Sequence, residues 1–80
     1  MTTHAASIWQ ANAFHDAGDQ GCARVILDAI AECMLRLAPH QTLEIRATDP
    51  CLVIDLIAWC RLTGHALVVH TGDRYLIRHA

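Results

Sequence analysis

The stretch "TDPCLVIDLIAWCRLTG", residues 48–64, is the part of the chain whose limits are marked most clearly. Thr48 or Asp49 can cap the start of a helix, and Pro50 suits a first turn because it has no amide hydrogen to donate there. Gly64 follows the last apolar positions, where a glycine commonly ends a helix. The sequence therefore predicts a helix that begins at Pro50 and is closed by Gly64.

Strand-like segments flank this predicted helix. Upstream, residues 43–48 alternate between apolar and polar side chains, which predicts a strand with one buried face. Its apolar positions are Leu43, Ile45 and Ala47, and its polar positions are Glu44, Arg46 and Thr48. Downstream, residues 65–70 and 74–79 lie on either side of the turn sequence TGD, so we predict a hairpin there.

The N-terminal half of the chain contains one more strand and one more helix. Residues 8–15, IWQANAFH, alternate loosely and predict a first strand, and residues 16–21, DAGDQG, predict a loop. Residues 25–37 follow helical spacing, which predicts an amphipathic helix that ends before residues 38–41. Its apolar stripe contains Ile26, Ile30, Cys33 and Leu37, and its polar stripe contains Arg24, Asp28, Glu32 and Arg36.

The predicted order of elements is β-α-β-α-β-β. Crossovers between parallel strands are right-handed, which places the first helix over one face of the sheet. If the second crossover lies on the same side, both helices cover that face. We therefore expect an α+β fold, a two-layer α/β sandwich with a four-stranded mixed sheet and two helices on one face. At 80 residues the chain is one domain, residues 1–80, in which we expect residues 1–7 to be flexible.

Composition excludes several classes of protein. The chain is 54% hydrophobic and 18% charged with a formal net charge of −2, which argues against a disordered chain and against a DNA-binding surface. The N-terminus has no basic region, and no stretch approaches the roughly 18 apolar residues of a membrane span. The four cysteines fit free thiols in a reducing compartment better than a disulfide scaffold, so we expect a cytoplasmic protein without membrane contact.

Cys22 is the candidate catalytic residue. It lies at the predicted start of the first helix, where unpaired amides and the helix dipole favour an anion such as a thiolate. Arg24 is close enough in sequence to add positive charge, and His15 could assist ionisation of the thiol across the loop. The alternative is that Cys22 merely fills a small space at the helix start, and the residues alone leave both readings open.

The other three cysteines differ from Cys22. Cys33 and Cys60 fall within apolar helical stretches, where a free cysteine usually acts as a small buried hydrophobe. Cys51 follows Pro50 at the predicted start of the second helix, so the same dipole argument applies to it with less force. We expect Cys33 and Cys60 in the core.

Several segments resemble the TusA-type (SirA-like) small sulfurtransferase family. They are DAGDQGC, LAPHQTLEIRATDP, and DLIAWCRLTGHALV with a terminal YLIR, and the resemblance spans residues 14–78. In that family a cysteine at the start of the first helix, within a Cys-Pro-x-Pro motif, accepts sulfur as a persulfide and passes it on. The resemblance implies that Cys22 is this residue and that the chain is a sulfur carrier.

The chain departs from the family motif at two positions. Ala23 and Val25 stand where the family has prolines, and the first helix appears one residue longer than is usual, counted from Cys22 to Pro39. These departures leave the pathway open among tRNA thiolation, molybdenum-cofactor maturation and sulfur oxidation.

The resemblance also implies partners. A donor protein of the rhodanese or cysteine desulfurase type would supply the sulfur, and an acceptor protein would provide the receiving thiol, since this chain has no Cys-x-x-Cys pair. We expect no cofactor and no metal, because the six histidines are scattered without a zinc motif.

The second helix carries a separate signal for partner binding. Asp55 and Arg61 are its only charges, and a helix apolar nearly all round needs cover on more than one side unless it is fully buried. Leu52, Ile54 and Ile57 stand where relatives often have small, polar or proline residues. We hypothesise that these three residues form an exposed patch that joins two copies of the chain. The alternative function is a non-catalytic interaction or regulatory module that uses this helix.

Overall fold

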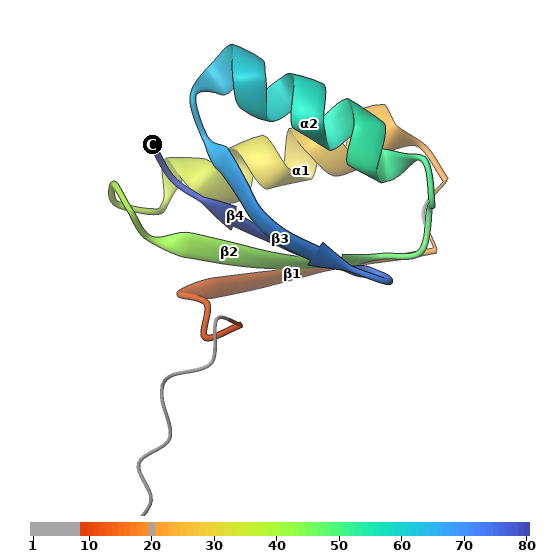
Figure 1. The fold of residues 1–80 in the computed structure, drawn as a ribbon, viewed down its shortest axis with the longest axis horizontal. Coiled ribbons are helices and arrows are strands. Elements are labelled where there is room, and N and C mark those ends of the chain that lie inside the picture. The colour runs from red at the N-terminus through yellow and green to blue at the C-terminus, as the bar shows by residue number, and fades with distance from the viewer. Residues whose placement is uncertain (1–8, 20) are drawn as a thin grey trace, which may run out of the picture.

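The computed structural model describes residues 9–19 and 21–80, so the segment 1–7 that was expected to be flexible lies outside the described residues. The elements are β1 (Ala13–Gly18), α1 (Ala23–Leu35), β2 (Thr42–Ala47), α2 (Leu52–Thr63), β3 (Ala66–Thr71) and β4 (Arg74–Arg78). The sheet order is β1-β2-β4-β3, with β1 parallel to β2 and the other pairs antiparallel. Both helices cover one face of this mixed sheet (Figure 1), which confirms the predicted fold class.

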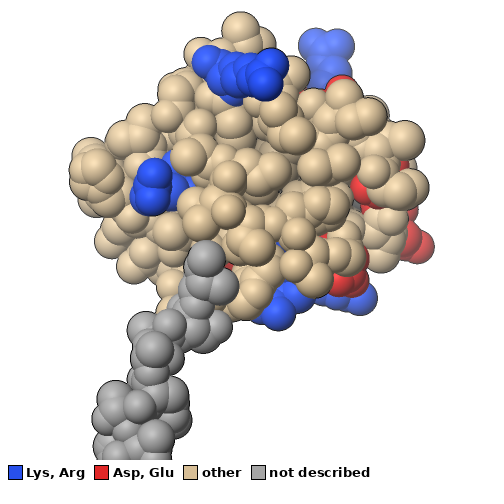
Figure 2. Space-filling view, in the orientation of Figure 1, with Lys and Arg blue, Asp and Glu red and all other residues tan. Residues whose placement is uncertain are grey.

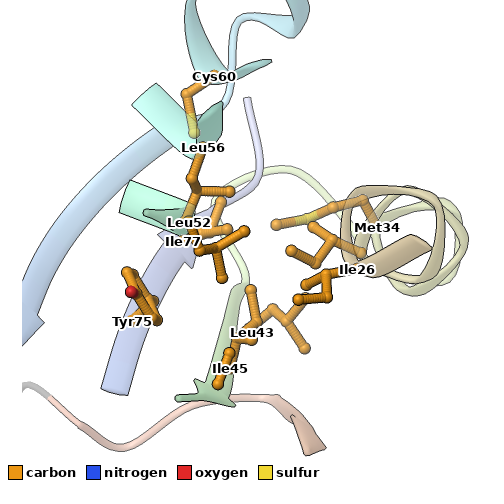
Figure 3. Packing of buried hydrophobic residues seen from close by; sticks show 11 residues of the cluster. Ile26, Met34, Leu43, Ile45, Leu52, Leu56, Cys60, Tyr75 and Ile77 are labelled. Atoms are coloured by element: carbon orange, nitrogen blue, oxygen red, sulfur yellow. The ribbon is translucent and has the colours of Figure 1, made fainter. Parts of the chain in front are cut away.

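A single apolar cluster fills the space between the helices and the sheet. Three residues of α1 point toward the central strands and α2 (Figure 3) because they recur every four positions along the helix. The alternation predicted for residues 43–48 is confirmed, with every second residue of β2 buried. The cluster comprises Ile26, Ile30 and Met34 of α1, Leu43, Ile45 and Ala47 of β2, Leu52, Leu56 and Cys60 of α2, and Tyr75 and Ile77 of β4.

The position predicted for the first strand was wrong by several residues. The strand was expected at 8–15, but β1 spans Ala13–Gly18 and includes half of the segment predicted as a loop. The pairing with β2 is set by Asn12, whose amide donates to the Thr42 carbonyl at 2.9 Å and whose side-chain oxygen accepts from the Thr42 amide at 2.9 Å. Residue 8 lies outside the described residues.

The limits of both helices also shift slightly. The helix predicted at residues 25–37 runs from Ala23 to Leu35, two residues earlier at each end. In α2, Pro50 and Cys51 precede the helix rather than forming its first turn. Gly64 ends α2 as predicted, with φ at 85°, a left-handed conformation that glycine adopts without a steric penalty.

The face of the sheet that the helices leave uncovered has its own small apolar centre. Leu76 alternates with the core residues of β4 and therefore lies on this second face, where it is nevertheless buried. Beside it, the Nε of Arg74 donates to Oε2 of Glu44 at 2.9 Å, and the Arg74 guanidinium lies 4.0 Å from the Trp9 ring centroid. A cation over an aromatic ring and an ion pair thus border Leu76 on this side.

Three aromatic rings pack together beside the C-terminal residue of the chain. The His65 ring lies 5.4 Å from the Trp59 ring and 4.7 Å from the His79 ring, and its Nδ1 accepts from the Ala80 amide at 3.0 Å. Burial, and secondly the nearby His79, lower the pKa of His65 below its ordinary value. His65 is therefore held in place as a neutral acceptor.

We predict that Leu56→Ala lowers the free energy of unfolding by about 2–5 kcal/mol, because it leaves a cavity beneath α2. Leu62→Ala is the matched control on the same helix, since Leu62 is 87% exposed, and it should change stability by less than about 0.5 kcal/mol. Urea unfolding of both variants in dilute solution measures the difference. Equal losses of stability would contradict the assigned core.

We also predict that His65 makes the fold less stable in mild acid. Because its pKa is lower in the folded chain, the unfolded chain takes up the proton first, so stability falls as the pH drops below the ordinary histidine value of about 6.5. His65→Gln should reduce the loss of stability between pH 7 and pH 5, measured as the shift in the urea midpoint. An unchanged shift would contradict this role.

Candidate functional site

Both helices begin at the same edge of the sheet, beyond the ends of the parallel strands β1 and β2 (Figure 1). The two loops that lead into the helices are joined there. The carbonyl oxygen of Gly18 accepts from the Thr48 amide at 3.0 Å and from the Thr48 hydroxyl at 3.2 Å. Thr48, one of the two predicted caps, thus links the loops instead of capping α2.

Cys22 occupies the capping position at the start of α1. Its backbone is extended, its carbonyl accepts the first helical hydrogen bond from the Ile26 amide at 3.2 Å, and its side chain is exposed and free. The amides of Ala23, Arg24 and Val25 have no hydrogen-bond partner among the described residues. The first turn of α1 contains no acidic residue. A negative charge on the sulfur would therefore meet unpaired donors and no carboxylate of the first turn.

Cys51 occupies the equivalent position at the start of α2 and is also exposed and free. Its surroundings are different. Its amide donates to Oδ1 of Asp49 at 3.0 Å, and Asp55 stands in the first turn of the helix. Two carboxylates, those of Asp49 and Asp55, therefore oppose a negative charge at Cys51. The Asp49 carboxylate also already accepts the hydrogen bond of the Cys51 amide. The backbone differs too, since Cys22 is extended whereas Cys51 has a right-handed helical conformation and its carbonyl accepts from the Ile54 amide at 3.3 Å.

The two remaining cysteines belong to the helix interior. Cys60 is 6% exposed, and burial raises the pKa of its thiol, which keeps it protonated. Cys33 is half-buried and packs against the core cluster. The prediction that both belong to the core is confirmed for Cys60, and Cys33 lies at the margin of the core.

The two residues expected to support the Cys22 thiolate are not joined to it. His15 is half-buried on β1 opposite Ile45, and Arg24 is exposed on the first turn of α1. Within residues 9–19 and 21–80, no hydrogen bond connects either side chain to Cys22. Their influence on this thiol stays a prediction.

The predicted partner surface on α2 needs one correction. Leu52 is fully buried in the core, since it lies on the same side of the helix as Leu56 and Cys60. Ile54 is 69% exposed and Ile57 is 40% exposed, so these two residues do reach the surface. Sequence reasoning missed the exposed Leu62, although its spacing of eight residues from Ile54 places the two on one helix face.

The described part of the chain has no group of three or more His, Cys, Asp or Glu side chains placed to hold a metal ion. Nor does its surface enclose a pocket. None of its helices has the length and apolar character needed to cross a membrane.

Comparison with known families finds a match over most of the chain. The family model described as "Sulfurtransferase TusA" matches residues 16–78, which include both helices, the central strands and Cys22. No curated protein matches the chain significantly.

We predict that a carboxylate in the first turn of α1 slows alkylation of Cys22, because the thiolate is the reacting form. Arg24→Glu should lower the rate with iodoacetamide at pH 7 about two- to fivefold relative to Arg24→Gln, which has similar size and no charge. Peptide mapping measures each cysteine separately, so Cys51 serves as an internal reference. Equal rates at Cys22 in the two variants would contradict the electrostatic argument.

Proposed function

Because the chain belongs to the TusA sulfurtransferase family, we propose that it is a sulfur carrier that holds sulfane sulfur as a persulfide on Cys22. The observation on which this proposal chiefly rests is the exposed Cys22 thiol at the start of α1, next to unpaired amides and without an acidic residue in the first turn.

Sulfur transfer to and from Cys22 needs two displacement steps. In the first, the Cys22 thiolate attacks the outer sulfur of a donor persulfide, so a new S–S bond forms as the donor's S–S bond breaks and the donor leaves as a thiolate. In the second, an acceptor thiolate attacks the outer sulfur of the Cys22 persulfide, and Cys22 leaves as a thiolate. Neither step has a net redox change, since one sulfane sulfur moves from thiol to thiol.

The start of α1 supports both steps because Cys22 must attack as an anion and leave as an anion. Helix amides stabilise both states. Ala23 and Val25, which replace the prolines of the family motif, each have an amide hydrogen that proline lacks. The replacement therefore leaves more amide donors at the start of α1. It also leaves the backbone of this first turn less rigid than prolines would make it.

Donor and acceptor are proteins in this proposal. The donor belongs to the rhodanese or cysteine desulfurase class, and the acceptor brings its own thiol. A reducing compartment such as the cytoplasm keeps Cys22 available for transfer. Because the Cys22 thiol is exposed on the surface, the sulfur atom of a donor or acceptor protein can reach it directly.

The exposed side of α2 favours a second candidate function. In a non-catalytic interaction or regulatory module, Ile54 and Ile57 would contact a partner and Cys22 would be dispensable. The two functions predict opposite results for sulfur loading of Cys22.

We predict that incubation with a small-molecule persulfide adds about 32 Da, the mass of one sulfur atom, to Cys22. Cys22→Ser should lose the adduct, whereas Cys51→Ser, a matched change at the start of the other helix, should keep it. Mass spectrometry of intact protein and of peptides measures both the mass and its position. An adduct absent from Cys22, or found on Cys51 instead, would contradict the proposal and favour the interaction module.

A further inference from the structure

The charged side chains are divided between the two ends of the helices. Carboxylates gather at the edge of the sheet where α1 and α2 begin, and most of the acidic side chains visible in Figure 2 lie toward that edge. Exposed arginines lie at the opposite edge, where both helices end. We name these surfaces by their residues: the acidic edge comprises Asp16, Asp19, Asp49, Asp55 and Asp73, and the basic edge comprises Arg36, Arg61 and Arg78.

The topology of the sheet brings the carboxylates of the acidic edge together. Asp19, Asp49 and Asp73 follow β1, β2 and β3, and these three strands run in the same direction, so they end on the same side. Burial raises the pKa of Tyr75, and the charges of Asp49 and Asp73 raise it further, which places both carboxylates near one ring. Segments that are far apart in the sequence therefore share this edge.

Arginines offset only part of the charge of the acidic edge. Those on the same side of the molecule are Arg24, Arg46 and Arg74. The guanidinium of Arg46 lies 3.5 Å from Oδ1 of Asp16 and 3.1 Å from Oδ2 of Asp73, and Arg74 is already paired with Glu44.

The remaining carboxylates keep the acidic edge negative. Within residues 9–19 and 21–80, the side chains of Asp19, Asp49 and Asp55 form no ion pair. Arg24 and the starts of the two helices, each worth about half a positive charge, offset these carboxylates only in part.

The basic edge carries the opposite charge. Arg36 follows α1, Arg61 lies in the last turn of α2, and Arg78 ends β4, which runs antiparallel to β2. All three side chains are exposed, and none forms an ion pair with another described residue. The carboxylate closest to them along the helices is Glu32, one turn before the end of α1. The basic edge therefore stays positive.

The two edges match element by element when one copy of the chain is moved along the helix direction. The end of each helix in one copy then faces the start of the same helix in the next copy. The end of β4 likewise faces the turn that precedes β4. Because the movement is a translation, neither copy is turned over and opposite charges face each other at every element. The facing pairs are Arg36 with Asp19, Arg61 with Asp55, and Arg78 with Asp73.

Two leucines add an apolar contact to this match. Leu35 ends α1 and is 86% exposed, and Leu62 lies in the last turn of α2 and is 87% exposed. In the same arrangement they face the exposed, uncharged thiols of Cys22 and Cys51. The unpaired carbonyls that end each helix also face the unpaired amides that begin it.

We propose that the acidic edge of one copy binds the basic edge of the next copy, in a weak head-to-tail association that covers Cys22. Such a contact does not close on itself, so each pair keeps one free edge of either kind and can add further copies. Only helix ends and one strand end take part, which buries less than the roughly 1,000 Å² of a stable interface. Copies therefore exchange readily.

Sedimentation velocity tests the association. The weight-average mass should rise from the 8.8 kDa of one chain to more than twice that value as concentration increases from about 10 μM to about 1 mM. Raising NaCl from about 20 mM to about 300 mM should lower the association constant about tenfold, because salt screens exposed charges. A monomer at every concentration, a mass that stops at two copies, or an association insensitive to salt overturns the proposal.

Cys22→Ser separates this association from the proposed sulfur transfer. The variant cannot carry sulfur at position 22, yet it keeps both charged edges and should associate like the wild type. A failure of sulfur loading in the wild type therefore leaves this proposal standing, whereas a monomeric Cys22→Ser at concentrations where the wild type associates contradicts it.

Two complementary variants test which surfaces meet. Asp19→Asn/Asp55→Asn removes charge from the acidic edge and keeps the basic edge, whereas Arg36→Gln/Arg61→Gln does the reverse. Each variant alone should stay monomeric at about 1 mM, because one of the two charged surfaces is weakened. An equimolar mixture should form pairs of twice the mass and nothing larger, since only one kind of contact can form. A mixture that stays monomeric, or a variant that associates alone, refutes the assigned edges.

The matched control is Asp28→Asn/Glu32→Gln. It removes two exposed carboxylates from the solvent side of α1, outside the acidic edge, and should not weaken association. Circular dichroism verifies that each variant is folded. If this control weakened association as much as Asp19→Asn/Asp55→Asn, overall charge and not the acidic edge would be responsible, and the proposal would be wrong.

Alkylation of the cysteines tests where the contact lies. The proposed contact covers the starts of both helices, so iodoacetamide should modify Cys22 and Cys51 at least about twofold more slowly at about 1 mM protein than at about 10 μM. Asp19→Asn/Asp55→Asn should show no such slowing. A rise in mass without slower alkylation of Cys22 would place the contact elsewhere on the molecule and overturn the proposal.

Discussion

The parallel pairing of β1 with β2 is the constraint on which the rest of the structure depends. Parallel neighbours cannot be joined by a tight turn, so the chain must return across the sheet through α1 before it can form β2. The same requirement applies to α2, since β3 is antiparallel to β4 and β4 is antiparallel to β2, which makes β3 run in the same direction as β2. Both helices therefore start at one edge of the sheet, and their capping residues, Cys22 and Cys51, lie at that edge.

The two cysteines differ in backbone conformation and in the charges beside them. Both are exposed, and both precede the first turn of a helix. Asp49 and Asp55 surround the start of α2 with negative charge, whereas the first turn of α1 has none and includes Arg24. The charged side chains near the two helix starts are thus the main difference on which the choice of Cys22 as the candidate residue depends.

Much of the fold could be predicted from the sequence because its turns are specified locally. Gly64 ends α2, and the sequence TGD joins β3 to β4 as expected, with Gly72 at a φ of 57°. The first strand was misplaced because its inward positions are Ala13, His15 and Ala17, two small residues and a polar one, which give no apolar contrast with their neighbours. The pairing that defines this strand depends on Asn12 and Thr42, which are 30 residues apart, and no local pattern reports such a contact.

The candidate site could be predicted only in part. The position of Cys22 at a helix start follows from the apolar periodicity of α1. The hydrogen bond from the Cys51 amide to the Asp49 carboxylate could not be predicted, because it depends on where the Asp49 side chain lies. Helix α2 is apolar on every side, so periodicity could not say which residues face inward. For that reason Leu52 was assigned to the surface and Leu62 was overlooked.

The hydrogen bonds between Thr48 and Gly18 restrict how far the Cys22 thiol can move, which matters for the proposed function. Gly18 is fixed to the sheet and to the neighbouring loop, and Cys22 is held four residues later by its carbonyl bond to Ile26. A thiol with so short a tether cannot travel between distant sites as a lipoyl or phosphopantetheine arm does. In the proposed function, sulfur on Cys22 would therefore stay at one point of the surface, and donor and acceptor would have to dock there one after the other.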